Sequence, residues 1–385
     1  MSSIPSVSGS CDARFARVRD VFAESFASGA ETGSSVAVSV DGMTVVDLWG
    51  GSADAAGTRP WQRDTIVNLY STTKGLAALC AHLLVDRGLL DLDAPVARYW
   101  PEFAAAGKES IPVRQLLCHQ AGLAAFRRPF SMDEYYDWDV TTSALAAETP
   151  WWEPGTAHGY HALTFGHLVG EVVRRISGKS LGAFFRDEVA RPLGADLHIG
   201  LAAGEDARVA DLIPPSADAL AAASSAAASG ANLELVAGVL GNPAVNPLDT
   251  RTRAWRSAEI PAANGHGNAR SIARVYAALA CGGQLDGVAL LRAESIANAS
   301  RVETSGVDMV LQFPIHWGLG YIVNADKALY GPNPNSFGHT GYGGSFGFAD
   351  PDARVSVGYA MNRMAATLAG EPRGTALVQA VYECL

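Results

Sequence analysis

The residues of this chain that point most directly to chemistry are Ser71 and Lys74, in the segment Ser71-Thr72-Thr73-Lys74. Helix-forming residues follow Ser71, and side chains three positions apart on a helix lie on one face. A serine hydroxyl becomes a good nucleophile when a neighbouring base takes its proton, and a lysine can serve once burial disfavours its charged form. The N-terminus of a helix also directs N–H groups toward developing negative charge. Taken alone, the spacing also fits a helix cap followed by a solvent-facing lysine.

Two further segments carry groups that suit acyl chemistry. Tyr160 stands in the middle of the chain, and the run His339-Thr340-Gly341-Tyr342 lies near its end. Each segment has an ordinary structural interpretation as well: a core tyrosine, a strand histidine bonded to a neighbour, and a glycine that marks a bulge or a close backbone approach. The three segments together, in this order along one chain, are far more specific than any one of them.

At these motifs the chain resembles the serine β-lactamase and penicillin-recognising enzyme superfamily, and above all the family VIII carboxylesterases and class C β-lactamase-like hydrolases. That superfamily has S-x-x-K, then a tyrosine motif, then a K-T-G or H-T-G strand. Residues 116–123 (LLCHQAGL) also match its L-L-x-H-x-x-G-L pattern. The resemblance covers nearly the whole chain, and it implies a β-lactamase/transpeptidase-like fold and an acyl-enzyme mechanism without cofactor or metal.

The resemblance also implies the roles of the catalytic residues. Ser71 would be the acylated nucleophile, Lys74 the proton acceptor or its electrostatic helper, and Tyr160 the shuttle that carries the proton to the leaving group. Which of Lys74 and Tyr160 acts as the base stays open, since such roles are disputed in related enzymes.

The H-T-G segment would complete the site. The backbone N–H groups of Ser71 and Tyr342 would form the oxyanion hole, which is usually the largest electrostatic contribution. Gly341 and His339 would line the site. His339 stands where many relatives have lysine, and it would donate a hydrogen bond into the site or assist Tyr160.

Two competing motifs are rejected. Residues 343–347 (GGSFG) match the G-x-S-x-G elbow of α/β-hydrolases, but that serine must lead into a helix and precede the catalytic histidine. Here a strand-turn-strand pattern follows Ser345, and the last histidine of the chain is His339. The histidines at 158, 161 and 167 match no usual zinc spacing, so we expect local hydrogen bonds there and no metal.

The sequence favours esters over β-lactams and D-alanyl-D-alanine peptides. Enzymes that act on those two classes work outside the cytoplasmic membrane, whereas the start of this chain lacks the basic and apolar segments of an export signal, so we expect a cytoplasmic protein. β-Lactam-processing relatives usually carry a polar residue, often Asn, two places after the motif tyrosine, where this chain has Ala162. We therefore expect hydrolysis of short-chain acyl esters, with weak β-lactam hydrolysis from the same machinery.

Two alternatives keep the same fold. An acyltransferase would use an alcohol in place of water to release the acyl group, and a non-catalytic binding protein would need none of the three reactive side chains. An apolar pocket for the acyl or alcohol group is expected from the aromatic residues of the middle region, namely Phe126, Phe130, Tyr135, Trp138, Trp151 and Trp152.

Composition excludes other function classes. The net charge is −10 and no basic run occurs, so a nucleic-acid partner is not expected. The longest charge-poor stretch, residues 219–230, is too short and too polar to cross a membrane. Five widely spaced cysteines argue against a disulfide framework. The expected partner is a small-molecule ester, and the oligomeric state is not predicted.

The pattern of predicted elements gives an α+β architecture. Strands occur at both ends of the chain and helices in its middle, so we expect one antiparallel sheet built from residues 1–74 and 310–385. Residues 75–309 form a mainly helical region, with the active site at the junction. Other predictions are a helix over 12–28, a hairpin turn at Asp41-Gly42, loops with one helix over 202–250, and a final helix over 372–383.

Overall fold

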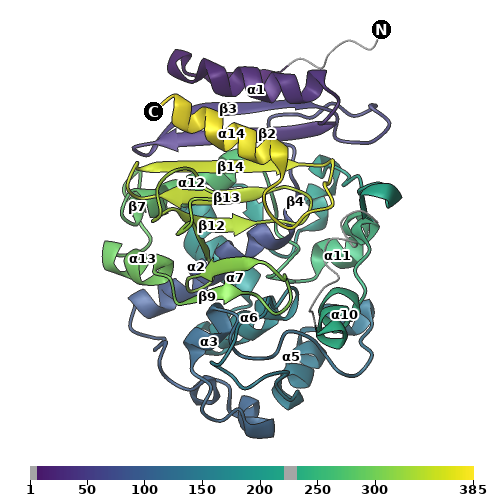
Figure 1. Cartoon of the computed structure of the whole chain (residues 1–385), viewed down its shortest axis with the longest axis vertical. Helices are drawn as coiled ribbons and strands as arrows, with labels where there is room; N and C mark the ends of the chain where they lie inside the picture. Colours follow the sequence, from purple (N-terminus) through teal and green to yellow (C-terminus); the bar gives the residue numbers. More distant parts are fainter. Residues whose placement is uncertain (1–6, 221–231) are drawn as a thin grey trace.

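The structure is a computed structural model that describes residues 7–220 and 232–385. Its main sheet has nine strands in the order β1-β3-β2-β14-β13-β12-β11-β10-β9, and each neighbouring pair is antiparallel (Figure 1). The strands are β1 (Ser8–Cys11), β2 (Gly33–Val40), β3 (Met43–Gly51), β9 (Thr304–Val307), β10 (Pro314–Trp317), β11 (Ile322–Val323), β12 (Phe337–Thr340), β13 (Phe346–Asp350) and β14 (Val355–Met361).

The predicted fold, an antiparallel sheet with helices and mixed α+β content, is confirmed. The pairing of β2 with β14 joins the two ends of the chain at the centre of the sheet. The turn between β2 and β3 is Asp41-Gly42, and both residues have positive φ, as a tight hairpin turn requires. The division of the chain into a sheet domain and a helical region stays a prediction.

Helices cover both faces of the sheet. On one face α12 packs against β2, β13 and β14, and a Cβ at Gly347 or Gly358 would collide with it. On the other face α1 and α14 pack together beside the central strands, as Figure 1 shows at the top of the molecule. Because both faces are covered, every residue of β14 is buried. These helices are α1 (Ala16–Ala27), α12 (Ala269–Ala280) and α14 (Pro372–Glu383).

The middle of the chain supplies further helices, of which α3, α5 and α6 lie toward the opposite end of the molecule (Figure 1). Among them α2 and α6 pack against each other and carry site residues. The helices are α2 (Thr73–Asp86), α3 (Val113–Leu117), α4 (Met132–Tyr136), α5 (Trp138–Ala147), α6 (Thr164–Ser177), α7 (Leu181–Phe185), α8 (Arg191–Leu193), α10 (Leu233–Gly241), α11 (Arg253–Ser257) and α13 (Ala293–Ser300).

Within the residues that the structure describes, five short strands lie outside the main sheet. β4 (Val67–Asn68), β6 (His266–Gly267) and β5 (Leu197–His198) form a three-stranded sheet, and β7 (Gln284–Leu285) pairs with β8 (Val288–Ala289). The predicted helices over 12–28 and 372–383 correspond to the first short 3₁₀ turn with α1 and to α14.

The segment predicted as loops with one helix, 202–250, lies partly outside the described residues. Its described part contains α10 and two short 3₁₀ helices, and residues 217–220 are helical as well. The charge-poor stretch 219–230 lies almost wholly outside them. Within the described ranges, no helix is long and apolar enough to cross a membrane.

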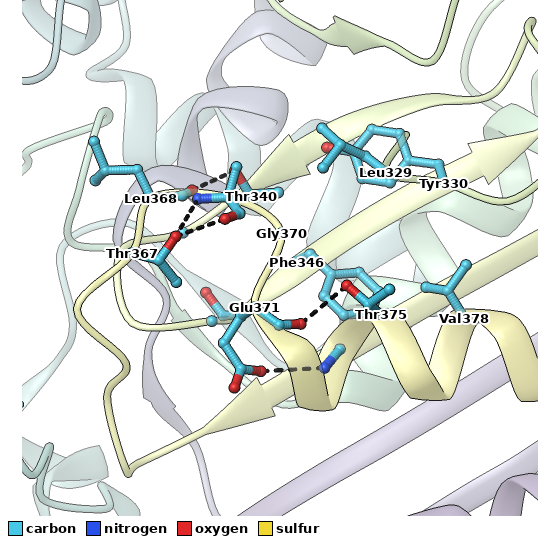
Figure 2. A pocket seen from close by; sticks show the side chains of 15 residues that line it. Leu329, Tyr330, Thr340, Phe346, Thr367, Leu368, Gly370, Glu371, Thr375 and Val378 are labelled. Atoms are coloured by element: carbon cyan, nitrogen blue, oxygen red, sulfur yellow. Dashed lines mark hydrogen bonds between the residues drawn. The ribbon is translucent and has the colours of Figure 1, made fainter. Parts of the chain in front are cut away.

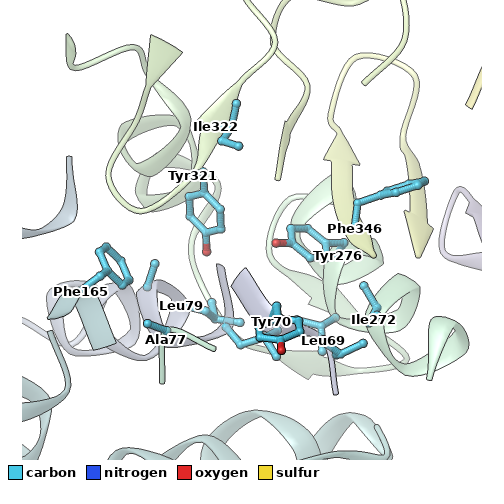
Figure 3. Packing of buried hydrophobic residues seen from close by; sticks show 14 of the residues in the cluster. Leu69, Tyr70, Ala77, Leu79, Phe165, Ile272, Tyr276, Tyr321, Ile322 and Phe346 are labelled. Carbon is cyan, nitrogen blue, oxygen red and sulfur yellow. The ribbon is translucent and has the colours of Figure 1, made fainter. Parts of the chain in front are cut away.

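The core continues between the sheet and α2. Tyr276 of α12 and Tyr321, next to β11, fill the space above Ala77 and Leu79 of α2 (Figure 3). Both tyrosines are about 1% exposed. A side chain at Gly75 would collide with the Tyr276 hydroxyl, so the glycine allows α2 to approach α12 closely. This packing fixes the helix that begins at the predicted nucleophile.

Candidate active site

Ser71 lies in a short 3₁₀ turn that leads directly into α2. Tyr70 before it has a φ of 43°, a conformation that residues with side chains rarely adopt, so the chain turns sharply just before the serine. The Thr73 hydroxyl holds this turn, because it donates to the Tyr70 carbonyl and accepts from the Gly265 N–H. Ser71 is partly exposed and its neighbours on α2 are buried, so it is the residue of this turn that a substrate can reach.

Lys74 is fully buried one helical turn after Ser71, with its Nζ 3.1 Å from the Ser71 Oγ. The Nζ also donates to the carbonyl oxygens of Ala162, at 2.7 Å, and Ala262, at 3.0 Å. Burial lowers the pKa of Lys74 well below its usual range. A neutral amine has two N–H bonds and one lone pair. In that form, with both N–H bonds directed at the carbonyls, the lone pair would face the serine hydroxyl, which is the arrangement a general base requires.

Tyr160 lies in the segment before α6, outside any helix or strand. The Lys74 Nζ lies 4.7 Å from the centre of its ring, and the Tyr160 hydroxyl is near enough to Ser71 for that serine to affect its pKa. Burial raises the pKa of the Tyr160 phenol, whereas the nearby Ser71 opposes that rise. The phenol therefore stays protonated at neutral pH. The structure brings the hydroxyl of Ser71, the amine of Lys74 and the phenol of Tyr160 together at one place.

His339 lies on β12 and is 2% exposed. Its Nδ1 is 2.7 Å from the Thr340 carbonyl oxygen, and since a carbonyl can only accept, Nδ1 carries the proton. Burial, followed by the nearby Lys74 amine in its protonated form, lowers the pKa of His339 to about 3. The ring is therefore neutral and its Nε2 is an acceptor. The predicted hydrogen-bond donation into the site would require the other tautomer, so assistance to Tyr160, 6.3 Å away between ring centres, fits the geometry better.

The turn that carries Tyr342 is tied to the segment before Ser71. Gly341 donates from its N–H to the Ser345 carbonyl, and the Ser345 hydroxyl donates to the Leu69 carbonyl at 2.8 Å. A Cβ at Gly341 would collide with that same Leu69 oxygen. Only glycine therefore allows β12 to approach the nucleophile segment this closely. The close approach supports the predicted pairing of the Ser71 and Tyr342 N–H groups as an oxyanion hole.

Ser345, the serine of the competing G-x-S-x-G motif, has a structural role. It is 1% exposed, and its hydroxyl lies 2.9 Å from the Thr72 Oγ1 as well as bonding to Leu69. The residues around it form a β-turn-β unit and lead into no helix. Ser345 therefore joins the turn that carries Tyr342 to the start of α2, and its hydroxyl is buried and already bonded.

The histidines of the middle region have local partners. His158 contacts Thr304 and the Gly306 carbonyl, His161 accepts from the Leu123 N–H, and His167 contacts the Tyr135 hydroxyl. Over residues 7–220 and 232–385, no group of three or more potential ligands is arranged to hold a metal ion.

A small cavity lies between Thr340 at the end of β12 and the residues that precede and begin α14 (Figure 2). It is bounded by the loop before α14, by α14 itself and by Thr340, whose hydroxyl donates to the Leu368 carbonyl at 2.8 Å. Its volume of about 30 Å³ suffices for one or two water molecules. Gly341 and Ser345 also line it, so the cavity lies beside the turn that carries Tyr342. The volume of the cavity is too small for an ester substrate.

The six aromatic residues of the predicted pocket differ in their burial. Phe126, Phe130 and Tyr135 are core residues, each at most 5% exposed. The three tryptophans are partly exposed. Among them Trp152 packs against Gly159, the residue directly before Tyr160.

Sequence reasoning missed three contributors to the site. The Ala162 and Ala262 carbonyls orient Lys74, and backbone acceptors leave no signal in residue type. Asp308, fully buried, accepts a hydrogen bond from the Tyr160 N–H at 2.9 Å. It is 148 positions away in the sequence, and no short motif connects the two residues.

Comparison with known proteins gives consistent matches along the chain. Residues 18–381 match the Beta-lactamase family. "Esterase/beta-lactamase LipL" of Mycobacterium tuberculosis is 38% identical over 367 residues, which cover 94% of this chain and 84% of that protein. "Esterase EstB" of Burkholderia gladioli is 30% identical over 373 residues, covering 86% of each.

Two solved structures superpose over the whole fold. The crystal structure of a family VIII carboxylesterase has a TM-score of 0.93 and 48% identity, and covers 99% of this chain and 100% of its own. A penicillin-binding protein homologue from Caulobacter crescentus has the same TM-score and coverage, with 42% identity.

Proposed function

Since this chain belongs to the beta-lactamase family, we propose that it cleaves short-chain carboxylic esters through an acyl-enzyme on Ser71. The relatives named as esterases, together with the superposable family VIII carboxylesterase, make it a serine ester hydrolase. The observation that carries the mechanism is the buried Lys74 amine, because its two carbonyl partners leave one lone pair for the Ser71 hydroxyl.

The proposed reaction proceeds in two halves. Lys74 takes the proton of Ser71 as the oxygen attacks the ester carbonyl carbon, and the N–H groups of Ser71 and Tyr342 stabilise the resulting oxyanion. Tyr160 donates its phenolic proton to the departing alkoxide, which leaves as an alcohol, and the phenol recovers a proton from Lys74. Water then attacks the acyl carbonyl carbon while Lys74 takes its proton; the bond to Ser71 breaks, Tyr160 returns a proton to the Ser71 oxygen and is refilled from Lys74, and the carboxylic acid is released.

Covalent labelling tests the nucleophile. A fluorophosphonate probe should modify one serine, and mass mapping should place it on the peptide that contains Ser71. Modification on the peptide that contains Ser345 would contradict the proposal and restore the α/β-hydrolase interpretation. Absence of any label, in protein that is folded, would favour a non-catalytic role.

We propose esters as the preferred substrates. His339 is neutral at physiological pH, so it cannot form an ion pair with a carboxylate on the substrate. β-Lactams and peptides that end in D-alanine carry such a carboxylate. At the second place after Tyr160 the chain has Ala162, whose carbonyl is already bonded to Lys74. A weaker β-lactamase activity remains part of the proposal, since one relative is named for both activities.

The substrate preference can be measured directly. kcat/KM for nitrophenyl butyrate should exceed that for a chromogenic cephalosporin by about 100-fold, because missing polar contacts discriminate strongly between substrates. A series from acetate to decanoate should peak at short chains. Faster turnover of the cephalosporin would overturn the ester assignment. Transesterification products after addition of an alcohol would favour the acyltransferase alternative.

Replacing Tyr160 with phenylalanine tests the proton shuttle. An alkyl alkoxide needs a proton to leave, whereas nitrophenolate leaves without one. Tyr160→Phe should therefore lower kcat for ethyl butyrate by about 10³-fold and for nitrophenyl butyrate by only about tenfold. Equal losses on both esters would argue that the phenol acts as the base on Ser71 and not on the leaving group.

The pH profile tests the charge state of Lys74. The amine accepts a proton only when neutral, and burial lowers its pKa from 10.5, so activity should fall as the pH decreases through that lowered value. Burial raises the pKa of Tyr160 above 10, so its ionisation should cause no alkaline loss. kcat/KM measured from about pH 5 to 10 should rise to a plateau. A decline between about pH 8 and 10 would contradict this assignment.

We also propose a cytoplasmic location and a small-molecule ester as the partner. The thiols of all five cysteines are free, which fits a reducing compartment. Activity recovered mainly in the periplasmic or culture fraction of a native host would refute that location.

A further inference from the structure

The segment that holds Tyr160 has no secondary structure to fix it. Residues 157–161 form neither helix nor strand, and separate long-range hydrogen bonds hold their backbone. The Gly159 and His161 N–H groups donate to the carbonyl oxygen and the Nδ1 of His119. The Tyr160 N–H donates to the Oδ1 of Asp308, at 2.9 Å. Asp308 follows directly after β9, the edge strand of the main sheet. The sheet edge therefore anchors the loop that carries the phenol.

Asp308 is a fully buried carboxyl group with several N–H donors. Its Oδ1 accepts from the N–H groups of Tyr160, Val310 and Leu311, each at 2.9 Å. Its Oδ2 accepts from the indole Nε1–H of Trp317 at 3.3 Å. The bonds to Val310 and Leu311 hold the carboxyl within its own turn, so it is a rigid acceptor for the other two partners.

Asp308 also acts on the Tyr160 ring indirectly, through Trp317. The Trp317 and Tyr160 rings are parallel within 3°, with their centres 5.7 Å apart. The carboxyl group thus fixes the backbone of Tyr160 through one oxygen and the ring that stacks on it through the other. Both contacts act on the same side chain from different directions.

We propose that Asp308 is the positioning residue of the Tyr160 phenol, holding it where it can pass a proton between Ser71 and the leaving group. This inference rests on the proposed function, in which Tyr160 moves that proton. The Asp308 carboxyl also contributes to the raised pKa of Tyr160, which keeps the phenol protonated. A shift of about 1 Å in a positioned group can cost roughly 100-fold in rate.

The test compares Asp308→Ala and Asp308→Asn with a matched control, Asp350→Ala. Asp350 is an equally buried carboxyl on β13 that accepts from backbone N–H groups and from the Tyr382 hydroxyl. Each variant is assayed on ethyl butyrate and nitrophenyl butyrate, and its thermal stability is recorded.

Asp308→Ala should lower kcat for ethyl butyrate by about 100-fold and for nitrophenyl butyrate by about tenfold, with KM changed less than about threefold. Asp308→Asn keeps one oxygen for the Tyr160 N–H but turns an amide N–H toward Trp317. Asp308→Asn should lower kcat for ethyl butyrate by about tenfold and leave kcat for nitrophenyl butyrate nearly unchanged. Asp350→Ala should lose stability but keep kcat on both esters within about threefold.

Equal losses on the two esters, or losses matched by Asp350→Ala, would reduce Asp308 to a structural residue and overturn the inference. If Asp308→Ala does not fold, Asp308→Asn alone carries the test through its leaving-group dependence. Wild-type protein serves as the reference throughout. If it neither turns over esters nor is labelled at Ser71, the proposed function fails; if it does both and Asp308→Asn behaves like it, only the role of Asp308 fails.

Discussion

Ser71→Ala is expected to lower kcat for ester hydrolysis by at least about 10⁵-fold. The Ser71 oxygen is the atom that forms the acyl bond, so no covalent route remains without it. What survives is the stabilisation that the oxyanion hole gives to direct attack by water. The measurement is the initial rate on nitrophenyl butyrate at high enzyme concentration, together with loss of fluorophosphonate labelling.

The fold should tolerate this change. Ser71 is partly exposed, and its side chain is not part of the core, so the melting temperature should stay within a few degrees of wild type. Substantial residual turnover, or continued labelling on another peptide, would show that a different residue is the nucleophile.

Lys74→Met is expected to lower kcat by about 10⁴-fold, since it removes the base while keeping a side chain of similar length. The change also leaves the Ala162 and Ala262 carbonyls without the amine that they accept from, which should cost about 1–3 kcal/mol of stability. kcat is measured at a temperature well below the unfolding transition, so that the two effects are separated.

The chain offers a matched control in Lys108. This lysine is also buried, and its Nζ donates to three backbone carbonyls, of Ala105, Ala146 and Glu148, with no nucleophile beside it. Lys108→Met should lose a similar amount of stability yet keep kcat within about threefold. If both variants lose activity equally, the effect of Lys74 is structural and its assignment as the base is wrong.

Spacing and turn chemistry made part of this molecule predictable. The S-x-x-K interval places Ser71 and Lys74 on one helix face, and Asp41-Gly42 has the conformational freedom that a tight hairpin needs. Tyr160 was identified only through family resemblance, because its loop has no periodicity that could place it near Ser71.

The remaining features depend on backbone groups and long-range contacts. The tautomer of His339 is set by the Thr340 carbonyl, and the orientation of Lys74 by two other carbonyls, none of which residue type reveals. The anchoring of Tyr160 by Asp308 joins segments that only the sheet edge brings together. Residue type also did not show which of the predicted pocket aromatics are buried in the core; the structure does.

The pairing of β2 with β14 has a consequence for biosynthesis. β2 leaves the ribosome early, but its partner, residues 355–361, emerges only after roughly 300 further residues, which takes roughly 15–60 s at bacterial elongation rates. During that interval the nascent chain displays an apolar strand with an open edge, the kind of surface that promotes aggregation. Yield of active enzyme during overexpression should therefore depend on chaperone supply and growth temperature more than on the stability of the finished protein.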